Sequence, residues 1–245
     1  MWTREQLKSN AKNSFRRNYW PCVGVAFIMT VAEGVGAASS ARGGADTSPQ
    51  AMGADDYVQN YFGFGVEESY GFTAMMTAIV VALLIFTAVL GIFVTNVLRI
   101  GANRFFIQNR IELPRAGMVL DGFRSGHYGN IVLTMFLKDL YVTLWTLLLI
   151  IPGIIKELEY LMVPYILAEN PGMNRKEAFA ISKRMMDGEK LNAFILQLSF
   201  IGWQILAVFT CGLLGIFYVN PYMEATMAEL YAYNKAKAYQ EGYIQ

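Results

Sequence analysis

Charged side chains are scarce in this sequence, and cysteine and histidine are scarcer still. Only 16% of its 245 residues are Asp, Glu, Lys or Arg, against about 25% in soluble domains. Two cysteines and one histidine are too few for a disulfide framework or a zinc cluster, and we expect no cofactor. The 20 basic residues nearly balance the 19 acidic ones, so nucleic acid is not an expected partner. Apolar residues are abundant instead, at 55% of the chain.

These apolar residues are gathered into six runs that approach the length of a membrane span, which is about 20 mostly apolar residues. The fourth run is short, and charged residues occupy its first half. At about 1.5 Å per residue it would reach only about 22 Å as a helix. We therefore predict an all-α, polytopic membrane protein with about six transmembrane helices, paired as three hairpins. The runs cover residues 19–38, 72–98, 130–151, 154–168, 192–211 and 213–230.

The distribution of basic residues predicts which side of the membrane each connection occupies. Cytoplasmic connections are enriched in Lys and Arg, and all but three of the 20 basic residues lie in segments 1–18, 99–129, 169–190 and 231–245. Only Arg42 lies in segment 39–71. The whole chain, 1–245, is therefore expected to be one integral membrane domain with both termini cytoplasmic and residues 39–71 extracellular. A cleavable signal peptide is the alternative for the first run, because its basic start is followed by small residues.

The sequence also contains an internal repeat. The tetrapeptide Leu-Gly-Ile-Phe begins at Leu90 and again at Leu214, and Asn96 and Asn220 follow at the same offset. A second set of matches, Trp145, Gly153 and Pro164-Tyr165 with Trp203, Gly212 and Pro221-Tyr222, relates the last two hairpins. Such self-similarity predicts that one structural unit is used three times.

An amphipathic, cationic stretch precedes each hairpin, at residues 4–17, 118–124 and 174–187. In the third stretch, Asn174 can cap a helix and Gly188 can end it. Its Ala178, Phe179, Met185 and Met186 offer an apolar face beside the basic residues. We expect these helices to lie on the cytoplasmic leaflet, where basic side chains contact lipid phosphates. The expected headgroup contacts are Arg175, Lys176, Lys183 and Arg184.

Three motifs carry a family resemblance: LWTLLLIIPGIIK at 144–156, VPYILAENP at 163–171 and LSFIGW at 198–203. Together they resemble an uncharacterised family of bacterial integral membrane proteins, the domain of unknown function 975. That family is in turn distantly similar to the membrane domain attached to some glycerophosphodiester phosphodiesterases. The resemblance implies a multi-pass protein of the bacterial plasma membrane, and it brings no activity or catalytic residues.

Polar residues inside the predicted spans are the candidate functional residues, because a charge at the centre of a bilayer costs about 2.5–3.5 kcal/mol and usually faces protein or water. The alternative is a structural role, in which these charges pair between helices and Lys138 extends toward the cytoplasmic interface. Neighbours in a helix point about 100° apart, so we expect Lys138 and Asp139 to need partners on other helices. Depth alone suggests Arg99 or Arg104 as a partner of Glu224. The candidate intramembrane polar site comprises Lys138, Asp139, Glu224, Asn96 and Asn220.

Two functions remain open at this point. The first is a non-enzymatic module that binds membrane lipids or a partner protein of the membrane or envelope. The alternative is a small-solute transporter or channel that uses Lys138, Asp139 and Glu224 as a path. An enzyme is disfavoured, since neither Ser182 nor Ser199 has a nearby base and His127 stands alone.

Overall fold

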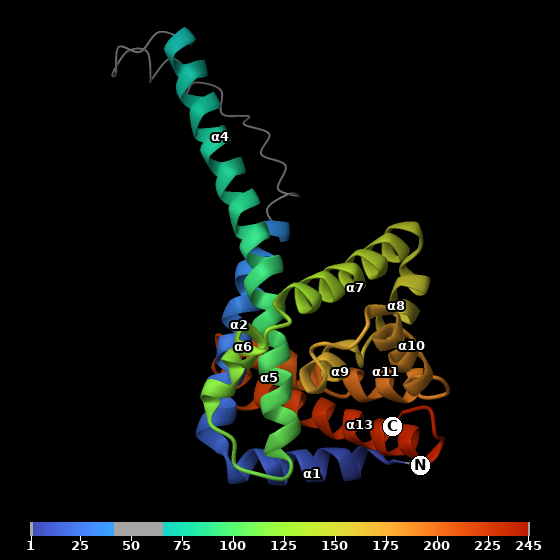
Figure 1. Cartoon of the computed structure of the whole chain (residues 1–245). Coiled ribbons are helices and arrows are strands. Elements are labelled where there is room, and N and C mark those ends of the chain that lie inside the picture. Colours follow the sequence, from blue (N-terminus) through green and yellow to red (C-terminus); the bar gives the residue numbers. More distant parts are fainter. Residues whose placement is uncertain (1, 42–65, 245) are drawn as a thin grey trace.

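The computed structural model describes residues 2–41 and 66–244, so most of the predicted extracellular segment 39–71 lies outside the described residues. All regular structure in the described ranges is helical, which confirms the all-α prediction (Figure 1). The α-helices are α1 (Arg4–Arg17), α2 (Tyr19–Ala41), α4 (Val66–Leu90), α5 (Asn96–Asn109), α6 (Asp121–Arg124), α7 (Tyr128–Leu148), α8 (Ile150–Glu159), α9 (Val163–Glu169), α10 (Arg175–Met185), α11 (Lys190–Leu198), α12 (Ile201–Phe209) and α13 (Asn220–Gln240). A 3₁₀ helix, η3 (Ala116–Leu120), and two π-helices, η2 (Gly91–Thr95) and η4 (Gly215–Val219), join them.

The base of the molecule is a layer of amphipathic helices at which both termini lie (Figure 1). Thr3 caps α1 in a reciprocal arrangement with Gln6, which satisfies two backbone donors. The buried face of α1, with Phe15 at its end, packs along α13. On α13, the buried Tyr231 hydroxyl donates to Glu169 Oε2 at 2.7 Å. Burial and the Glu169 carboxylate raise the pKa of Tyr231, so this hydroxyl stays protonated and keeps donating.

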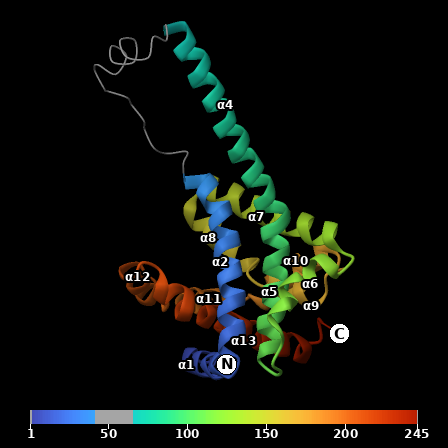
Figure 2. The ribbon, with the colours of Figure 1, turned by 90° about the vertical axis from the view of Figure 1, so that its left-hand side faces the viewer.

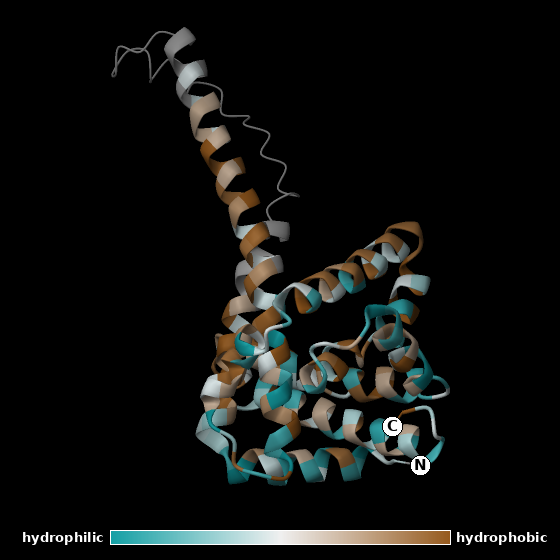
Figure 3. Ribbon diagram, viewed as in Figure 1, coloured by the Kyte–Doolittle hydropathy of each residue, from teal (hydrophilic) through white to brown (hydrophobic). Residues whose placement is uncertain are grey.

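Three apolar projections leave this base: α2 with α4, α7 with α8, and α12 with η4. They diverge in different directions (Figures 1 and 2), and the lower part of α4 and the α7–α8 tip are strongly hydrophobic (Figure 3). At the α7–α8 tip, Leu147 is 85% exposed, and at the α12 tip Phe209 is 81% exposed. Apolar surface on this scale marks a site of contact with membrane or protein rather than with water.

Two helices are long and apolar enough to cross a membrane, Tyr128–Leu148 and Lys190–Phe209, and two shorter apolar helices lie at Tyr19–Ala32 and Thr73–Thr87. In the most apolar 18-residue segment of each long helix, only 28% and 22% of the segment is buried. The core helix of a soluble protein is mostly buried. Membrane association is therefore supported by these two helices, while the remaining predicted spans do not meet the same criterion within the described residues.

The fourth predicted span is not one helix. The chain leaves α8 after Glu159, turns at residues 160–162 and begins α9 at Val163. Just before the turn, Glu159 accepts from Lys156 Nζ and from Lys190 Nζ, each at 2.7 Å. These ion pairs tie α8 to α11, so the charged residues of the fourth run contact other helices of the protein. The fifth predicted span contains a two-residue turn at 199–200, between α11 and α12, although the two helices together form the apolar segment Lys190–Phe209.

The repeated Leu-Gly-Ile-Phe motif adopts the same unusual geometry at both positions. Each copy forms a five-residue π-helix, and a regular helix begins at the following asparagine, Asn96 in one copy and Asn220 in the other. π-Helices are rare and concentrate at functional sites, so their recurrence at matched positions supports the predicted repeat of the hairpin unit.

The amphipathic stretches differ from the prediction in what covers their apolar faces. In α10, Ala178 and Met185 are buried in the main core, and Phe179 packs edge-on against Tyr141 and Tyr160. The apolar face of α10 is thus occupied by protein, whereas the contact of its basic residues with lipid headgroups stays a prediction. An amphipathic helix shows the same spacing of apolar residues whether its apolar face contacts protein or lipid. The sequence pattern alone therefore did not distinguish the two.

Candidate binding pocket

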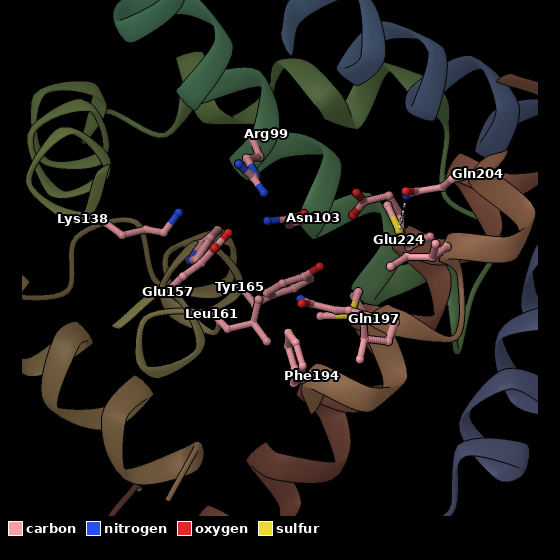
Figure 4. A pocket seen from close by; sticks show the side chains of 15 residues that line it. Arg99, Asn103, Lys138, Glu157, Leu161, Tyr165, Phe194, Gln197, Gln204 and Glu224 are labelled. Carbon is pink, nitrogen blue, oxygen red and sulfur yellow. Dashed lines mark hydrogen bonds between the residues drawn. The ribbon is translucent and has the colours of Figure 1, made fainter. Parts of the chain in front are cut away.

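A cavity of about 400 Å³ lies where all three hairpin units meet (Figure 4). Exposed residues are part of its wall, so the cavity reaches the molecular surface. Its lining comes from seven helices and comprises Arg99 and Asn103 of α5, Lys138 of α7, Glu157 of α8, Pro164 and Tyr165 of α9, Phe194, Gln197 and Leu198 of α11, Ile201 and Gln204 of α12, and Met223, Glu224 and Met227 of α13, together with Leu161.

The structure brings two of the five sequence-predicted site residues, Lys138 and Glu224, into this one cavity. Asp139 is outside the lining, and its side chain is 51% exposed, against 11% for Lys138. Lys138 Nζ nevertheless lies 3.3 Å from Asp139 Oδ1. The expectation that these neighbours would need partners on other helices was wrong, because the long lysine side chain bends back to reach the adjacent carboxylate.

Arg99 and Asn103 are one helical turn apart on α5, so they share a face and both reach the cavity. Of the two arginines suggested as partners of Glu224, Arg99 lies in the same cavity. Arg104 instead forms an ion pair with Asp121, with 3.9 Å between Arg104 Nη1 and Asp121 Oδ2. Arg99 and Glu157 are also within electrostatic reach of the Lys138 ammonium. The cavity therefore gathers two cations and two carboxylates from four different helices.

Asn103 is one of the polar cavity residues that the sequence reasoning missed, together with Gln197 and Gln204. It is only 1% exposed, and its Nδ2 has no hydrogen-bond partner among the described residues. Buried polar groups almost always have partners, so this donor beside the cavity is a candidate contact for a ligand that carries an acceptor. Its spacing of four residues after Arg99 on a helix was the available signal.

The two repeat asparagines do not reach the cavity. Asn220 Nδ2 donates to Thr30 Oγ1 at 2.9 Å, and Thr95, next to Asn96, donates through its hydroxyl to the Ala32 carbonyl at 3.1 Å. Both π-helices are thereby tied to α2. These contacts are the interhelical hydrogen bonds that hold apolar helices together.

The basic residues of α10 form a separate surface. Arg175, Lys176, Lys183 and Arg184 are all exposed and lie outside the cavity, and Arg184 covers the ring of Tyr243 at 4.4 Å. Within the described ranges, no group of three or more His, Cys, Asp or Glu side chains could hold a metal ion.

These features define a helical, membrane-associated protein with a charged cavity between apolar hairpins. Residues 64–237 match a family described as "Protein of unknown function (DUF975)". The match covers most of the chain, and the protein belongs to this family, as its motifs indicated. No curated protein and no solved structure matches the chain.

Proposed function

We propose that this protein is a non-enzymatic membrane module that binds a membrane lipid in the cavity between its hairpins. The observation that carries the proposal is the position of the cavity, whose charged lining lies directly beside exposed apolar helices. Leu198 and Ile201 belong both to its wall and to the exposed apolar surface. A lipid has the same division, with a polar headgroup and apolar chains.

The proposal places the three hairpins in a bacterial plasma membrane as six spans, with both termini cytoplasmic. The exposed apolar tips support insertion, because burying such surface in lipid is favourable by roughly 25 cal/mol per Å². The hairpins must become more nearly parallel than they are in this structure for all three to cross one bilayer. The exposed basic side chains of α10 would then contact headgroups at the cytoplasmic surface.

Native mass spectrometry of the full chain released from lipid nanodiscs tests the proposal. We expect the wild-type protein to retain one phospholipid, and Asn103→Leu to reduce the retained fraction about tenfold, because a buried donor to a charged group is lost. Asn13→Leu makes the same substitution on the exposed surface of α1 and should change nothing. Retention that is equal in all three proteins would contradict lipid binding in the cavity.

A small-solute transporter or channel is the second candidate, favoured by the presence of Lys138 and Glu224 in one cavity. It predicts that proteoliposomes carrying the full chain conduct potassium or chloride, read out with a potential-sensitive dye. It also predicts that Glu224→Gln abolishes this conductance, while Glu177→Gln on exposed α10 leaves it unchanged. Vesicles no leakier than protein-free ones would rule out an ion channel.

A further inference from the structure

The charges that line the cavity already balance one another. Lys138 Nζ lies 3.3 Å from Asp139 Oδ1, and Glu157 is close enough to interact with the same ammonium. Arg99 and Glu224 each have an interaction partner as well. The lining holds two cations and two carboxylates, so its formal charge sums to zero. A ligand with a net charge would therefore enter without a counter-charge, which is costly where water is excluded.

The hydrogen-bonding groups that remain for a ligand are uncharged amides. Asn103 Nδ2 is buried and has no partner among the described residues, and the half-buried amide of Gln197 has none there either. Gln204 makes one weak contact, 3.7 Å from its Nε2 to Met223 Sδ, which leaves its carbonyl oxygen as an acceptor. The three amides come from α5, α11 and α12, and those of Asn103 and Gln197 extend into the same space (Figure 4).

This set of amides matches hydroxyl groups better than charged groups. An amide offers both donors and acceptors, whereas a phosphate or carboxylate offers acceptors only and an ammonium offers donors only. A hydroxyl donates and accepts and carries no charge. Several hydroxyls on one headgroup, as on a sugar, therefore pair with all three amides and leave the balanced charges undisturbed. Phe194, one turn before Gln197 on α11, adds an aromatic wall against which the C–H groups of a sugar ring can pack.

We propose that the cavity binds the uncharged, hydroxyl-rich headgroup of a glycolipid, with the sugar at Asn103, Gln197 and Gln204. This inference rests on the proposed lipid-binding function and specifies its ligand. The acyl chains leave past Leu198 and Ile201, which belong both to the cavity wall and to the exposed apolar surface. In a bilayer of phospholipid alone, the cavity holds a phospholipid through Asn103 and the same apolar wall, and a glycolipid displaces it.

The test places the full chain in nanodiscs that contain equal amounts of monogalactosyldiacylglycerol and phosphatidylcholine with matched acyl chains. Neither lipid has a net charge, so the comparison isolates the hydroxyls, and native mass spectrometry identifies the lipid retained. We expect the glycolipid to exceed the phospholipid about tenfold in the wild-type protein, the effect of roughly two neutral hydrogen bonds. Gln197→Met combined with Gln204→Met should remove this preference, and Asn103→Leu should lower retention of both lipids.

Two controls separate a lost contact from a lost fold. The double methionine variant should still retain phosphatidylcholine as the wild type does, because only the sugar contacts are lost. Gln240→Met makes the same substitution at the exposed end of α13, outside the cavity, and should keep the full preference for the glycolipid.

A second arm adds methyl galactoside, a soluble molecule with a similar set of hydroxyls, in an amount equal to the glycolipid. We expect the glycolipid to stay bound, because its acyl chains contribute to affinity through the apolar area that they bury. Displacement by methyl galactoside would identify a free sugar as the ligand and overturn the assignment to a glycolipid.

The outcomes distinguish this inference from the proposed function. Equal retention of the two lipids, or a preference that survives in the double methionine variant, would overturn the glycolipid and leave the lipid-binding function standing. A wild-type protein that retains neither lipid would overturn both.

Discussion

At the scale of single residues, Glu159 connects α8 with α10 and α11. Its side chain is 7% exposed and accepts from Lys156 and Lys190 at 2.7 Å, while its backbone carbonyl accepts from Ser182 of α10. Glu159→Gln would leave two lysines side by side without their counter-charge. Breaking a buried ion pair costs about 3–5 kcal/mol, and the partial exposure of both lysines lowers our expectation to about 2–3 kcal/mol.

Thermal unfolding in detergent, followed by circular dichroism, measures this loss as a lower Tm. Glu177→Gln is the matched control, because Glu177 is exposed on α10 and lies outside the cavity, and its Tm should stay close to that of the wild type. A Tm for Glu159→Gln equal to that of the control would show that the ion-pair cluster contributes nothing to stability.

Some cavity residues could be predicted from the sequence, and others could not. Lys138 and Glu224 were identified because a charge within an apolar run stands out on composition alone. Asn103 lies outside every predicted core position, in a segment expected to be a cytoplasmic connection, and only the packing of α5 against α9 and α13 places it at the cavity wall. Burial of that kind depends on tertiary contacts that no local pattern encodes.

At the scale of elements, the close approach of α5 to η3 depends on a residue without a side chain. A Cβ at Gly101 would lie 2.0 Å from the Val119 carbonyl oxygen, and a backbone atom cannot rotate away. We therefore expect Gly101→Ala to push the two elements apart and to destabilise the protein by about 1–3 kcal/mol. Gly24→Ala, on α2, meets nothing within 4 Å and should be neutral or stabilising by about 0.5–1 kcal/mol.

A guanidinium chloride titration in detergent compares the two alanine variants by the midpoint of unfolding. The α5–η3 contact also positions Arg99 and Asn103, so Gly101→Ala should weaken phospholipid retention as well, whereas Gly24→Ala should not. Equal midpoints for the two variants would contradict the close packing.

The elements themselves were largely predictable. The repeated Leu-Gly-Ile-Phe motif marked two equivalent second legs, and in both a π-helix is followed by an α-helix that begins at the repeated asparagine. The interruptions within the fourth and fifth runs were not foreseen, because hydropathy treats a run as uniform, whereas the turn at 160–162 is fixed by contacts such as the Ser182 hydroxyl accepting from the Met162 backbone amide.

At the scale of the whole molecule, the charged and apolar parts are separated into a base and three projections (Figure 3). Composition predicted this separation, since long uncharged runs alternate with basic connections. It did not predict that the amphipathic helices pack on one another, so that the base has its own core. The cavity sits at the junction of base and projections.

The two native cysteines offer a direct measurement of topology. Cys211 is exposed next to the tip of the third hairpin, and Cys22 is completely buried. If the hairpins cross the membrane with their tips outward, a membrane-impermeant maleimide will label Cys211 in intact cells and leave Cys22 unmodified. A cysteine introduced as Gln240→Cys, at the exposed end of α13, should react only after the membrane is permeabilised, because both termini belong on the opposite side. Labelling of Cys211 only after permeabilisation would place tip and termini in one compartment, and the third hairpin would then lie along the membrane surface instead of crossing it.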